Sequence, residues 1–278
     1  MKTVLIILSV AMLVLIISAL DCYCHIDTVR YTLPDFGAEG KLLCLSDLHG
    51  WSYGKDERRL LERIEEQNVQ HIVIAGDLIS RHAGEKQVSR MLDFVSALCE
   101  MAEVYYALGN HESDYIAVNG TDYLNKIAAC GAVVLADEWT DIELNGSALR
   151  IGAARGRYLN GTEKDEKTLQ MLQNIGKDGI PSIAVVHQPE NILYQNYADW
   201  TPDLYLCGHT HGGVWRIPGI GGVVAPSQGF FPQYDRGQFD LDGTPMIVSA
   251  GLSGYLFIPR VFNHPEICII ELYGGEND

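Results

Sequence analysis

Short runs of consecutive apolar residues recur along the chain, and the segments between them place apolar residues three or four positions apart. The runs are typical of strands buried on both faces, and the spaced segments are typical of amphipathic helices. The predicted buried strands are 41–46, 71–76, 103–109, 132–136, 182–187, 203–209, 246–251 and 266–272. The predicted helices are 56–67, 85–101, 122–130 and 165–174.

Two further segments predict antiparallel or extended structure. Residues 142–154 have the pattern of a β-hairpin, because Asn145-Gly146 is a typical two-residue turn between strands. Residues 25–33 predict an extended strand whose alternate apolar residues share one face. Buried strands that alternate with helices, joined by a hairpin, predict an α/β fold: a layered sandwich of two mixed sheets covered by helices.

The most apolar segment lies at the N-terminus, where Val4 to Leu20 carries no charged residue. This length is near the lower limit for a membrane-spanning helix, which needs about 20 residues. A cleaved signal peptide is the alternative, but Ile17 and Leu20 are bulky where cleavage requires small side chains. A lipoprotein-type cleavage before Cys22 is also disfavoured, because Asp21 would adjoin the cut. We therefore predict an uncleaved single-pass anchor.

The charges beside the apolar segment predict its orientation. Lys2 precedes the segment and Asp21 follows it directly, which favours an N-terminus on the cytoplasmic side of the cell membrane. We expect residues 1–22 to form the anchor. Residues 23–278 are then expected to form one folded domain outside the cytoplasm, since a domain of more than 200 residues is ordinary.

Charge and cysteine content exclude some classes of protein. The chain has 36 acidic and 20 basic residues, giving a formal net charge of −16. A surface of this charge repels the phosphate backbone, so a nucleic-acid partner is not expected. The seven cysteines form no CxxC pair, and Cys44, Cys207 and Cys268 lie in apolar runs where a buried thiol fits. We therefore do not expect a disulfide framework.

Polar side chains of a few types stand directly after the predicted buried strands. The motifs are SDLH, GD, GNH, a lone histidine and GHTH, and their polar residues are Asp47, His49, Asp77, Asn110, His111, His187, His209 and His211. The carboxyl ends of strands in an α/β sheet converge on one crevice, so these side chains are expected to lie close together. Glycines beside them suit sharp turns and close approach of the backbone to a ligand.

Each of these motifs has an ordinary structural explanation when it stands alone. An aspartate after a strand is usually a turn residue or a helix cap, and a lone histidine is usually a hydrogen-bonded core residue. The GNHE and GHTHGG motifs are more specific, because they place polar residues beside glycines at strand ends. All five motifs, in this order and each at a strand end, are better explained by a shared chemical site.

The motif series resembles that of the calcineurin-like metallophosphoesterase superfamily, which runs DxH, GD, GNH[DE], H and GHxH, over nearly all of the chain after the anchor. GHTHGGVWRIP and RVFNHPEICIIEL are similar to its membrane-anchored bacterial branch. The resemblance implies a four-layer α/β/β/α sandwich with two metal ions. It implies one ion held by Asp47, His49, Asp77 and His211. It implies the other held by Asp77, Asn110, His187 and His209, with Asp77 bridging.

The chemistry of the side chains agrees with this expectation. Carboxylate, amide and imidazole ligands suit Mn²⁺, Fe²⁺ or Zn²⁺, and the absence of thiolates from the motifs argues against a structural zinc site. Two such ions about 3.5–4 Å apart can share a hydroxide and clamp phosphoryl oxygens during an in-line displacement. His111 matches no metal ligand of the family, and it is expected to contact the phosphate and to protonate the leaving oxygen.

One position departs from the family pattern. In the Ser/Thr phosphatase branch, GD continues to an Asp-Arg pair whose aspartate orients the histidine of GNH. Here the continuation is GDLISR, so Ser80 replaces that aspartate while Arg81 is retained. His111 must therefore be oriented by another group or act mainly as a hydrogen-bond donor. Arg81 is a candidate substrate-binding residue.

A glycine- and proline-rich segment follows the last two histidines. Residues 212–237 contain seven glycines and three prolines, which argues against regular structure. The large residues of this segment are Trp215, Phe230, Phe231 and Tyr234. They either pack into a small core of the loop's own or form a wall of the substrate site. On the second interpretation Trp215, Phe230 and Phe231 bind substrate, and Trp51 and Tyr53 line the same crevice.

Three functional hypotheses remain at this point. The leading one is an enzyme that hydrolyses phosphomonoesters or phosphodiesters with a hydroxide that bridges two metal ions. A narrower alternative is a pyrophosphatase or phosphodiesterase for a lipid of the UDP-diacylglucosamine type, which the anchor and the apolar loop suggest. The third is a non-catalytic, membrane-tethered binding module of the same fold. The complete set of Asp, His and Asn residues argues against the third hypothesis.

Overall fold

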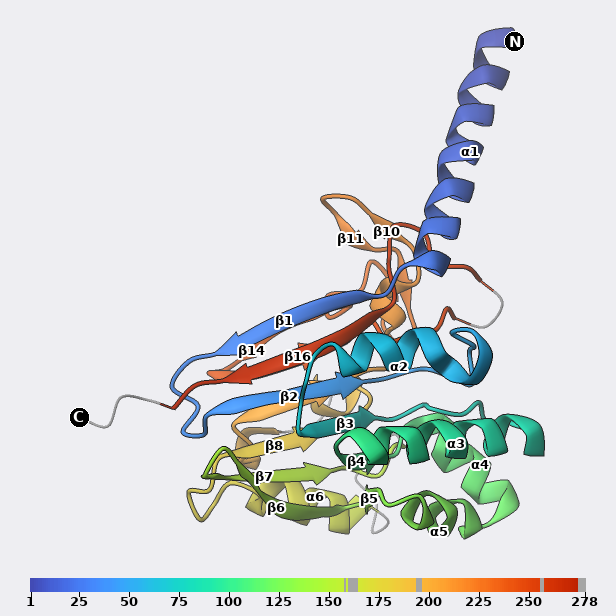
Figure 1. The fold of residues 1–278 in the computed structure, drawn as a ribbon. Helices are drawn as coiled ribbons and strands as arrows, with labels where there is room; N and C mark the ends of the chain where they lie inside the picture. Colours follow the sequence, from blue (N-terminus) through green and yellow to red (C-terminus); the bar gives the residue numbers. More distant parts are fainter. Residues whose placement is uncertain (158, 160–164, 194–196, 256–257, 275–278) are drawn as a thin grey trace.

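The computed structural model describes residues 1–157, 159, 165–193, 197–255 and 258–274. Two six-stranded mixed sheets form the centre of the molecule (Figure 1). In order across the first sheet the strands are β1 (Asp27–Leu33), β16 (Glu266–Leu272), β2 (Gly40–Leu45), β3 (His71–Ala75), β4 (Glu103–Ala107) and β5 (Val133–Leu135). Across the second they are β14 (Gly237–Leu241), β15 (Thr244–Val248), β9 (Leu204–Cys207), β8 (Ser182–Val185), β7 (Ser147–Ala153) and β6 (Glu138–Leu144).

Alternation of side chains along the strands places the sheets face to face. In β2, Leu43 and Leu45 point to the helices on the outer face, whereas Leu42 and Cys44 point to the second sheet. The other strands of the first sheet follow the same period of two, which is the geometry of the pleat. The inner layer is therefore an apolar core closed between two sheets, and it excludes water from the base of any site at the strand ends.

Helices cover both outer faces. On the first sheet lie α2 (Arg58–Glu65), α3 (Glu85–Met101) and α5 (Asp122–Ala129), and α4 (Asn110–Asn119) follows β4 directly. On the second sheet lie α6 (Glu166–Asn174) and α7 (Glu190–Leu193). This arrangement confirms the four-layer α/β/β/α sandwich. Three of its elements, α4, α7 and β14, were not predicted from the hydrophobic pattern.

The parallel core of each sheet explains why polar loops gather at one edge. Strands β2, β3, β4 and β5 run parallel, as do β7, β8, β9 and β15. Antiparallel pairs form at both edges of the second sheet and between β16 and β2 in the first. The predicted hairpin joins β6 to β7 through Asn145 and Gly146. Both turn residues have positive φ, at 50° and 85°, as a tight two-residue hairpin requires.

The segment 212–237 corrects one prediction. Its glycines and prolines do not exclude regular structure, because two short antiparallel pairs form within it. These are β10 (Arg216–Ile217) with β11 (Gly221–Gly222), and β12 (Val224–Ala225) with β13 (Gly229–Phe230). Asp235 joins the first pair to the rest of the segment, since its carboxylate accepts hydrogen bonds from Arg216 and from the Gly222 amide.

Helix α1 (Lys2–Cys24) projects away from the sandwich (Figure 1). Its mean hydropathy of 2.9 makes it long and apolar enough to cross a membrane, although a signal sequence has the same properties. The last turns of the helix contact the segment before β16. Ser18 Oγ accepts a hydrogen bond from the Phe262 amide at 2.7 Å, and Asp21 pairs with His264 at 2.8 Å. The helix is thus docked on the body at its C-terminal end.

Candidate metal centre

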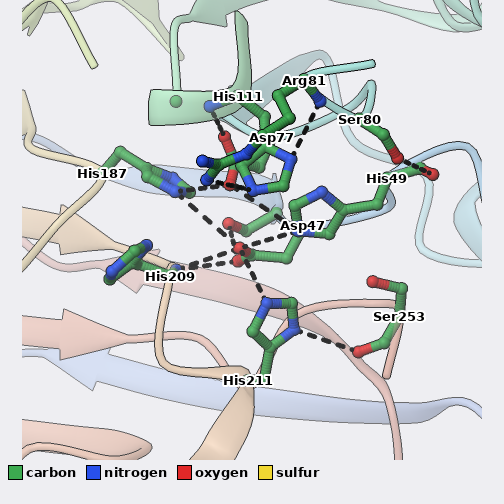
Figure 2. Close-up of polar contacts among 12 residues, drawn as sticks. Asp47, His49, Asp77, Ser80, Arg81, His111, His187, His209, His211 and Ser253 are labelled. Carbon is green, nitrogen blue, oxygen red and sulfur yellow. Dashed lines mark hydrogen bonds and ion pairs between the residues drawn. The ribbon is translucent and has the colours of Figure 1, made fainter. Parts of the chain in front are cut away.

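The residues of the five motifs come together at the carboxyl ends of strands from both sheets (Figure 2). Asp47 and His49 follow β2, and Asp77 follows β3. On the other side of the crevice, His187 follows β8. Both carboxylates and His187 are almost fully buried. The remaining members are Asn110 and His111 at the start of α4, and His209 and His211 after β9.

The imidazole nitrogens surround the two carboxylates at nitrogen–oxygen distances between 3.2 and 3.9 Å. His187 Nε2 lies 3.2 Å from an Asp77 oxygen and 3.8 Å from an Asp47 oxygen. His49 Nε2 lies 3.6 Å and 3.7 Å from the same two carboxylates. His211 Nε2 lies 3.9 Å from Asp47. The arrangement divides into groups of donors that could each hold an ion, among them Asp47–His49–His211 and Asp77–His187–His209.

An unusual backbone conformation is shared by five of these residues. Asp47, His49, Asp77, His209 and His211 all have positive φ, between 48° and 70°. Non-glycine residues seldom adopt this left-handed region, and they cluster where surrounding structure enforces it, often at functional sites. The turns aim each side chain into the crevice instead of along its strand.

Neighbouring glycines leave room for this packing. A Cβ atom on Gly109 would collide with the Asp77 carboxylate, and one on Gly208 would collide with Ser46 and Asp47. These two glycines are therefore needed for close approach of the backbone to the carboxylates.

Several buried polar atoms in the centre have no hydrogen-bond partner within the part of the chain that the structure describes. They are both ring nitrogens of His49, Nε2 of His187 and Oδ1 of Asn110. Buried polar atoms are rarely left without a partner, because the lost hydrogen bond costs about 1–3 kcal/mol. Oδ1 of Asn110 and one ring nitrogen of each neutral histidine carry lone pairs that can bind a metal, so the donor set fits divalent cations.

The backbone orients two of the histidines. His187 Nδ1 lies 2.6 Å from the Ala75 carbonyl, and His211 Nδ1 lies 3.2 Å from the Ser253 carbonyl. A carbonyl accepts only, so each Nδ1 carries the proton and each Nε2 presents a lone pair to the carboxylates when the ring is neutral. Hydrogen bonds of this kind are the usual way in which proteins fix a histidine that binds a metal.

The two buried carboxylates of the centre need positive charge nearby to compensate their negative charge. Burial raises the pKa of Asp77, but the charges of His187, His49 and His111, with a hydrogen bond from His187, together outweigh burial and leave the pKa well below its usual range. The same balance, again with His187 as the main opposing charge, lowers the pKa of Asp47. Burial lowers the pKa of His187, yet the charges of Asp77 and Asp47 raise it to about 10. Two buried anions are thus compensated by protons, which a bound metal cation would displace.

His111 is oriented by Arg81, which answers the question raised by Ser80. The Arg81 amide donates to His111 Nδ1 at 3.1 Å, and the Arg81 guanidinium lies 3.2 Å from Nε2. Ser80 instead donates from its hydroxyl to the His49 carbonyl at 3.0 Å. Burial lowers the pKa of His111 to about 4, more than the nearby Asp77 raises it. A neutral ring can accept from only one of these two Arg81 donors; when Nδ1 accepts from the amide, Nε2 carries the proton and the guanidinium must turn away from it.

A family model confirms the resemblance. Residues 40–213 match the model of the calcineurin-like phosphoesterases, and this range holds all eight residues of the five motifs. The chain belongs to the calcineurin-like phosphoesterase family.

Two relatives and one solved structure are similar to this chain. An uncharacterized metallophosphoesterase of Campylobacter jejuni is 30% identical over 262 residues, which cover 90% of this chain and 63% of that protein. This chain therefore spans less than two thirds of the Campylobacter protein. Phosphodiesterase YaeI of Escherichia coli is 25% identical over 259 residues, which cover 90% of each chain. A crystal structure of TT1561 from Thermus thermophilus has a TM-score of 0.50 at 12% identity, over 77% of this chain and 90% of that one, and shows the shared fold alone.

Glu112 is a functional residue that the motif analysis passed over, although it is the last letter of GNHE. It is fully buried beneath the centre. One carboxylate oxygen accepts from the Asp77 and Gly109 amides at 2.8 and 2.9 Å. The other accepts from the Ile79 amide at 3.1 Å and the Tyr106 hydroxyl at 3.0 Å. Glu112 thus ties the loop after β3 to the start of α4 in this phosphoesterase.

Arg260 and Asn263 also support the centre; they belong to the RVFNHP stretch of the family resemblance, but no role was expected for them. Arg260 is buried and donates from Nε to the Ser253 carbonyl at 2.9 Å. The same carbonyl faces His211. The Asn263 amide donates to the His211 carbonyl at 2.8 Å. These contacts fix the turn that contains His211 on the side away from the carboxylates.

The residues predicted to bind substrate do not all lie together in the structure. The 212–237 segment lies over the centre, since Ser227 Oγ is 3.3 Å from His209 Nε2. Phe230 and Phe231 remain 78% and 63% exposed, so the hypothesis of a core formed by the loop's own aromatics is wrong for them. Trp215 is partly exposed, and its indole donates to the Pro259 carbonyl.

The expectation for Trp51 and Tyr53 is also corrected. Trp51 contacts Tyr23 of α1 in an edge-on arrangement, with ring centroids 6.1 Å apart. Tyr53 is buried, and its hydroxyl donates to the Leu252 carbonyl. These two residues therefore line a cavity beside α1, and none of the aromatics of the 212–237 segment is among the described residues that line it.

Replacing Glu112 with glutamine is expected to weaken metal binding. The amide nitrogen of glutamine cannot accept, so two of the four donors around Glu112 would lose their partner. We expect the affinity for Mn²⁺ to fall by roughly 10–100-fold, as for other residues that orient ligands. Competition with a chromogenic chelator would measure it. Glu100→Gln, at an exposed position, is the matched control and should bind as the parent does; equal affinities in all three proteins would contradict the positioning role.

Proposed function

We propose that the protein is a dinuclear metal-dependent phosphoesterase that hydrolyses phosphomonoesters or phosphodiesters. The observation that carries this proposal is the pair of buried carboxylates, Asp47 and Asp77, facing imidazole nitrogens that have no other partner. Membership of the calcineurin-like phosphoesterase family supports the reaction class. The similarity to a protein named a phosphodiesterase supports the diester alternative.

The proposed ligand sets follow the grouping of the side chains. Asp47, His49 and His211 form one group, and Asp77, His187 and His209 form another. Asp77 also lies 3.6 Å from His49, a member of the first group, which supports its proposed role as the bridging ligand. Asn110 offers its partnerless Oδ1 to the second group. Mn²⁺, Fe²⁺ and Zn²⁺ are the ions that this mixture of oxygen and nitrogen ligands suits.

When bound, two such ions supply a hydroxide nucleophile at neutral pH and positive charge for the phosphoryl oxygens. Residues of the chain would orient the phosphoryl group and donate hydrogen bonds to it. His111 donates a hydrogen bond from Nε2 to an oxygen of the phosphoryl group, because its Nδ1 accepts from the Arg81 amide. Its pKa of about 4 keeps the ring neutral near pH 7, and nearby cations would lower that pKa further. Neutral His111 is therefore a hydrogen-bond donor rather than the proton source expected from the motif.

Substrate recognition is proposed for Arg81 and for the aromatics of the 212–237 segment. The Arg81 guanidinium is about half exposed and pairs with Asp114 at 3.2 Å, so it can turn to a phosphate oxygen without losing a buried contact. Phe230 and Phe231 offer exposed apolar surface next to a segment that contacts His209. We propose that Trp215, Phe230 and Phe231 contact the organic part of the substrate.

A membrane location is proposed from α1. We propose that the helix remains attached as a single-pass anchor and that the catalytic domain lies outside the cytoplasm. Its contacts with the body, through Ser18 and Asp21, support a helix that stays in place. Protease added to intact cells should degrade the domain while sparing a cytoplasmic control protein. A protected domain in cells that carry the protein in the membrane fraction would reverse the orientation.

Asp77→Ala is expected to remove both metal ions and metal-dependent turnover of an aryl phosphodiester, because one carboxylate is shared by both ligand groups. Metal content is measured by elemental analysis of the purified protein, and folding by circular dichroism. Asp93→Ala, at an exposed position on α3, should keep two ions per chain and full activity. A folded Asp77→Ala protein that retains two ions would refute the bridging role.

His111→Ala is expected to keep the metals and to lower kcat by roughly 10²–10³-fold, the usual effect of losing one donor to a developing oxyanion. Since the proposed role is hydrogen bonding by a neutral ring, the loss should be similar for aryl esters with good and poor leaving groups. The matched control is His82→Ala, because His82 is exposed and close in sequence. A loss that grows steadily with the pKa of the leaving alcohol would show proton donation instead.

A further inference from the structure

A cavity of about 330 Å³ lies between the last turns of α1 and the catalytic domain. Ala19, Cys22 and Tyr23 form its wall on the α1 side. Trp51 and Leu252 are part of the wall on the other side. The volume is at the lower end of the range for small-molecule sites, which is about 300–1,000 Å³. None of these residues belongs to the proposed ligand sets of the metal centre.

The cavity is placed where a membrane amphiphile would meet the protein. A membrane-spanning helix needs about 20 residues, so the turn that contains Ala19 and Tyr23 would lie at the level of the lipid headgroups. Leu20 and Tyr23 expose apolar surface on that turn, and Trp51 and Ile258 are also partly exposed beside the cavity. An apolar cavity at this depth is open to the chain of a lipid but offers little to a soluble ion.

Only a thin wall separates the cavity from the metal centre. The Leu252 amide donates to the Ser46 carbonyl at 2.9 Å, and the Ser253 amide donates to the Asp47 carbonyl at 2.8 Å. Trp51 follows His49 by two positions. A molecule that fills the cavity would therefore lie beside the backbone segments that carry Asp47 and His49.

One charged group borders the cavity. Arg260 is 5% exposed, and its Nε and Nη2 donate to backbone carbonyls of residues 250–253. Its Nη1 is buried without a hydrogen-bond partner among the residues that the structure describes. A buried guanidinium nitrogen of this kind favours an oxygen acceptor. An otherwise apolar space thus contains one donor for an ester or phosphate oxygen.

We propose that this cavity binds the apolar chain of a membrane amphiphile whose phosphate ester is the substrate of the adjacent metal centre. The inference rests on the proposed phosphoesterase function and names its substrate class. The chain lies against Ala19 and Trp51, and Arg260 Nη1 donates to an oxygen near the chain's linkage. The anchor then has a second role, because it forms one wall of the substrate site.

The test uses the full-length, metal-loaded protein in one detergent. Two 4-nitrophenyl phosphodiesters are compared, which differ only in the second alcohol, methyl or decyl. Burial of a chain at about 25 cal/mol/Å² predicts a preference for the decyl ester of about tenfold or more in kcat/KM. Ala19→Trp fills the cavity and should remove most of this preference, which is read as the ratio of the two kcat/KM values in each protein. Ala19→Leu, a smaller change, should give an intermediate ratio.

Ala11→Trp is the matched control, because Ala11 is an exposed alanine of the same helix away from the cavity. It corrects for any effect of an added tryptophan on detergent binding, and it should keep the parent's preference. An unchanged preference in Ala19→Trp would overturn the proposal. A decyl chain that binds in the cavity without raising kcat/KM would also overturn it, by showing a resident lipid instead of a substrate.

A direct binding measurement separates this proposal from the proposed function. Calorimetry with decylphosphonate and methylphosphonate needs no turnover. Tighter binding of the decyl compound by the parent and by Ala11→Trp, but not by Ala19→Trp, supports the cavity even if neither diester is hydrolysed. Tighter binding of the decyl compound without hydrolysis would contradict the proposed phosphoesterase function and leave the proposed cavity supported. Equal binding of the two phosphonates by the parent would contradict the proposed cavity and leave the phosphoesterase function untouched.

Discussion

The burial of two carboxylates in one small space is the constraint on which the rest of this structure depends. Asp47 and Asp77 are almost fully buried, and their negative charges must be compensated within the protein. The charge of His187 supplies part of the compensation, which raises its pKa to about 10. The left-handed turns, the glycines that allow close approach and the four hydrogen bonds to Glu112 all serve to hold these anions against the imidazoles. A protein stabilised only by its core would have no need of such an arrangement.

Each of the two sheets contributes different residues to the centre. The first sheet supplies both carboxylates and the helix that begins at Asn110, whereas the second supplies the histidines that complete each group. The apolar layer between the sheets keeps the two sets in register and closes the base of the centre to water. The turn that holds His211 is supported by Arg260, which also borders the cavity beside α1. Residues 260–263 thus support the His211 turn and also contact the last turns of α1.

Much of this fold and site could be predicted from local patterns. The apolar runs identified the buried strands, and the motifs at their ends identified the residues that the structure brings together. The patterns failed where long-range packing decides the outcome. Helix α4 begins inside the GNHE motif, where Glu112 is fixed by amides from two loops and not by helical periodicity. Arg260 stands in a segment without regular pattern, and its role depends on carbonyls that the fold brings to it. Tyr53 was assigned to the wrong wall because no local signal shows that the last turns of α1 dock on the domain beside it.

The central claim is that two metal ions share the carboxylate of Asp77. Anomalous diffraction from crystals of the Mn²⁺-loaded protein tests it most directly, because it locates each ion independently of activity. We expect two anomalous peaks per chain, each about 2 Å from an Asp77 oxygen, one beside His49 and His211 and the other beside His187 and His209. A single peak, or two peaks that do not share Asp77, would contradict a dinuclear centre bridged by this carboxylate.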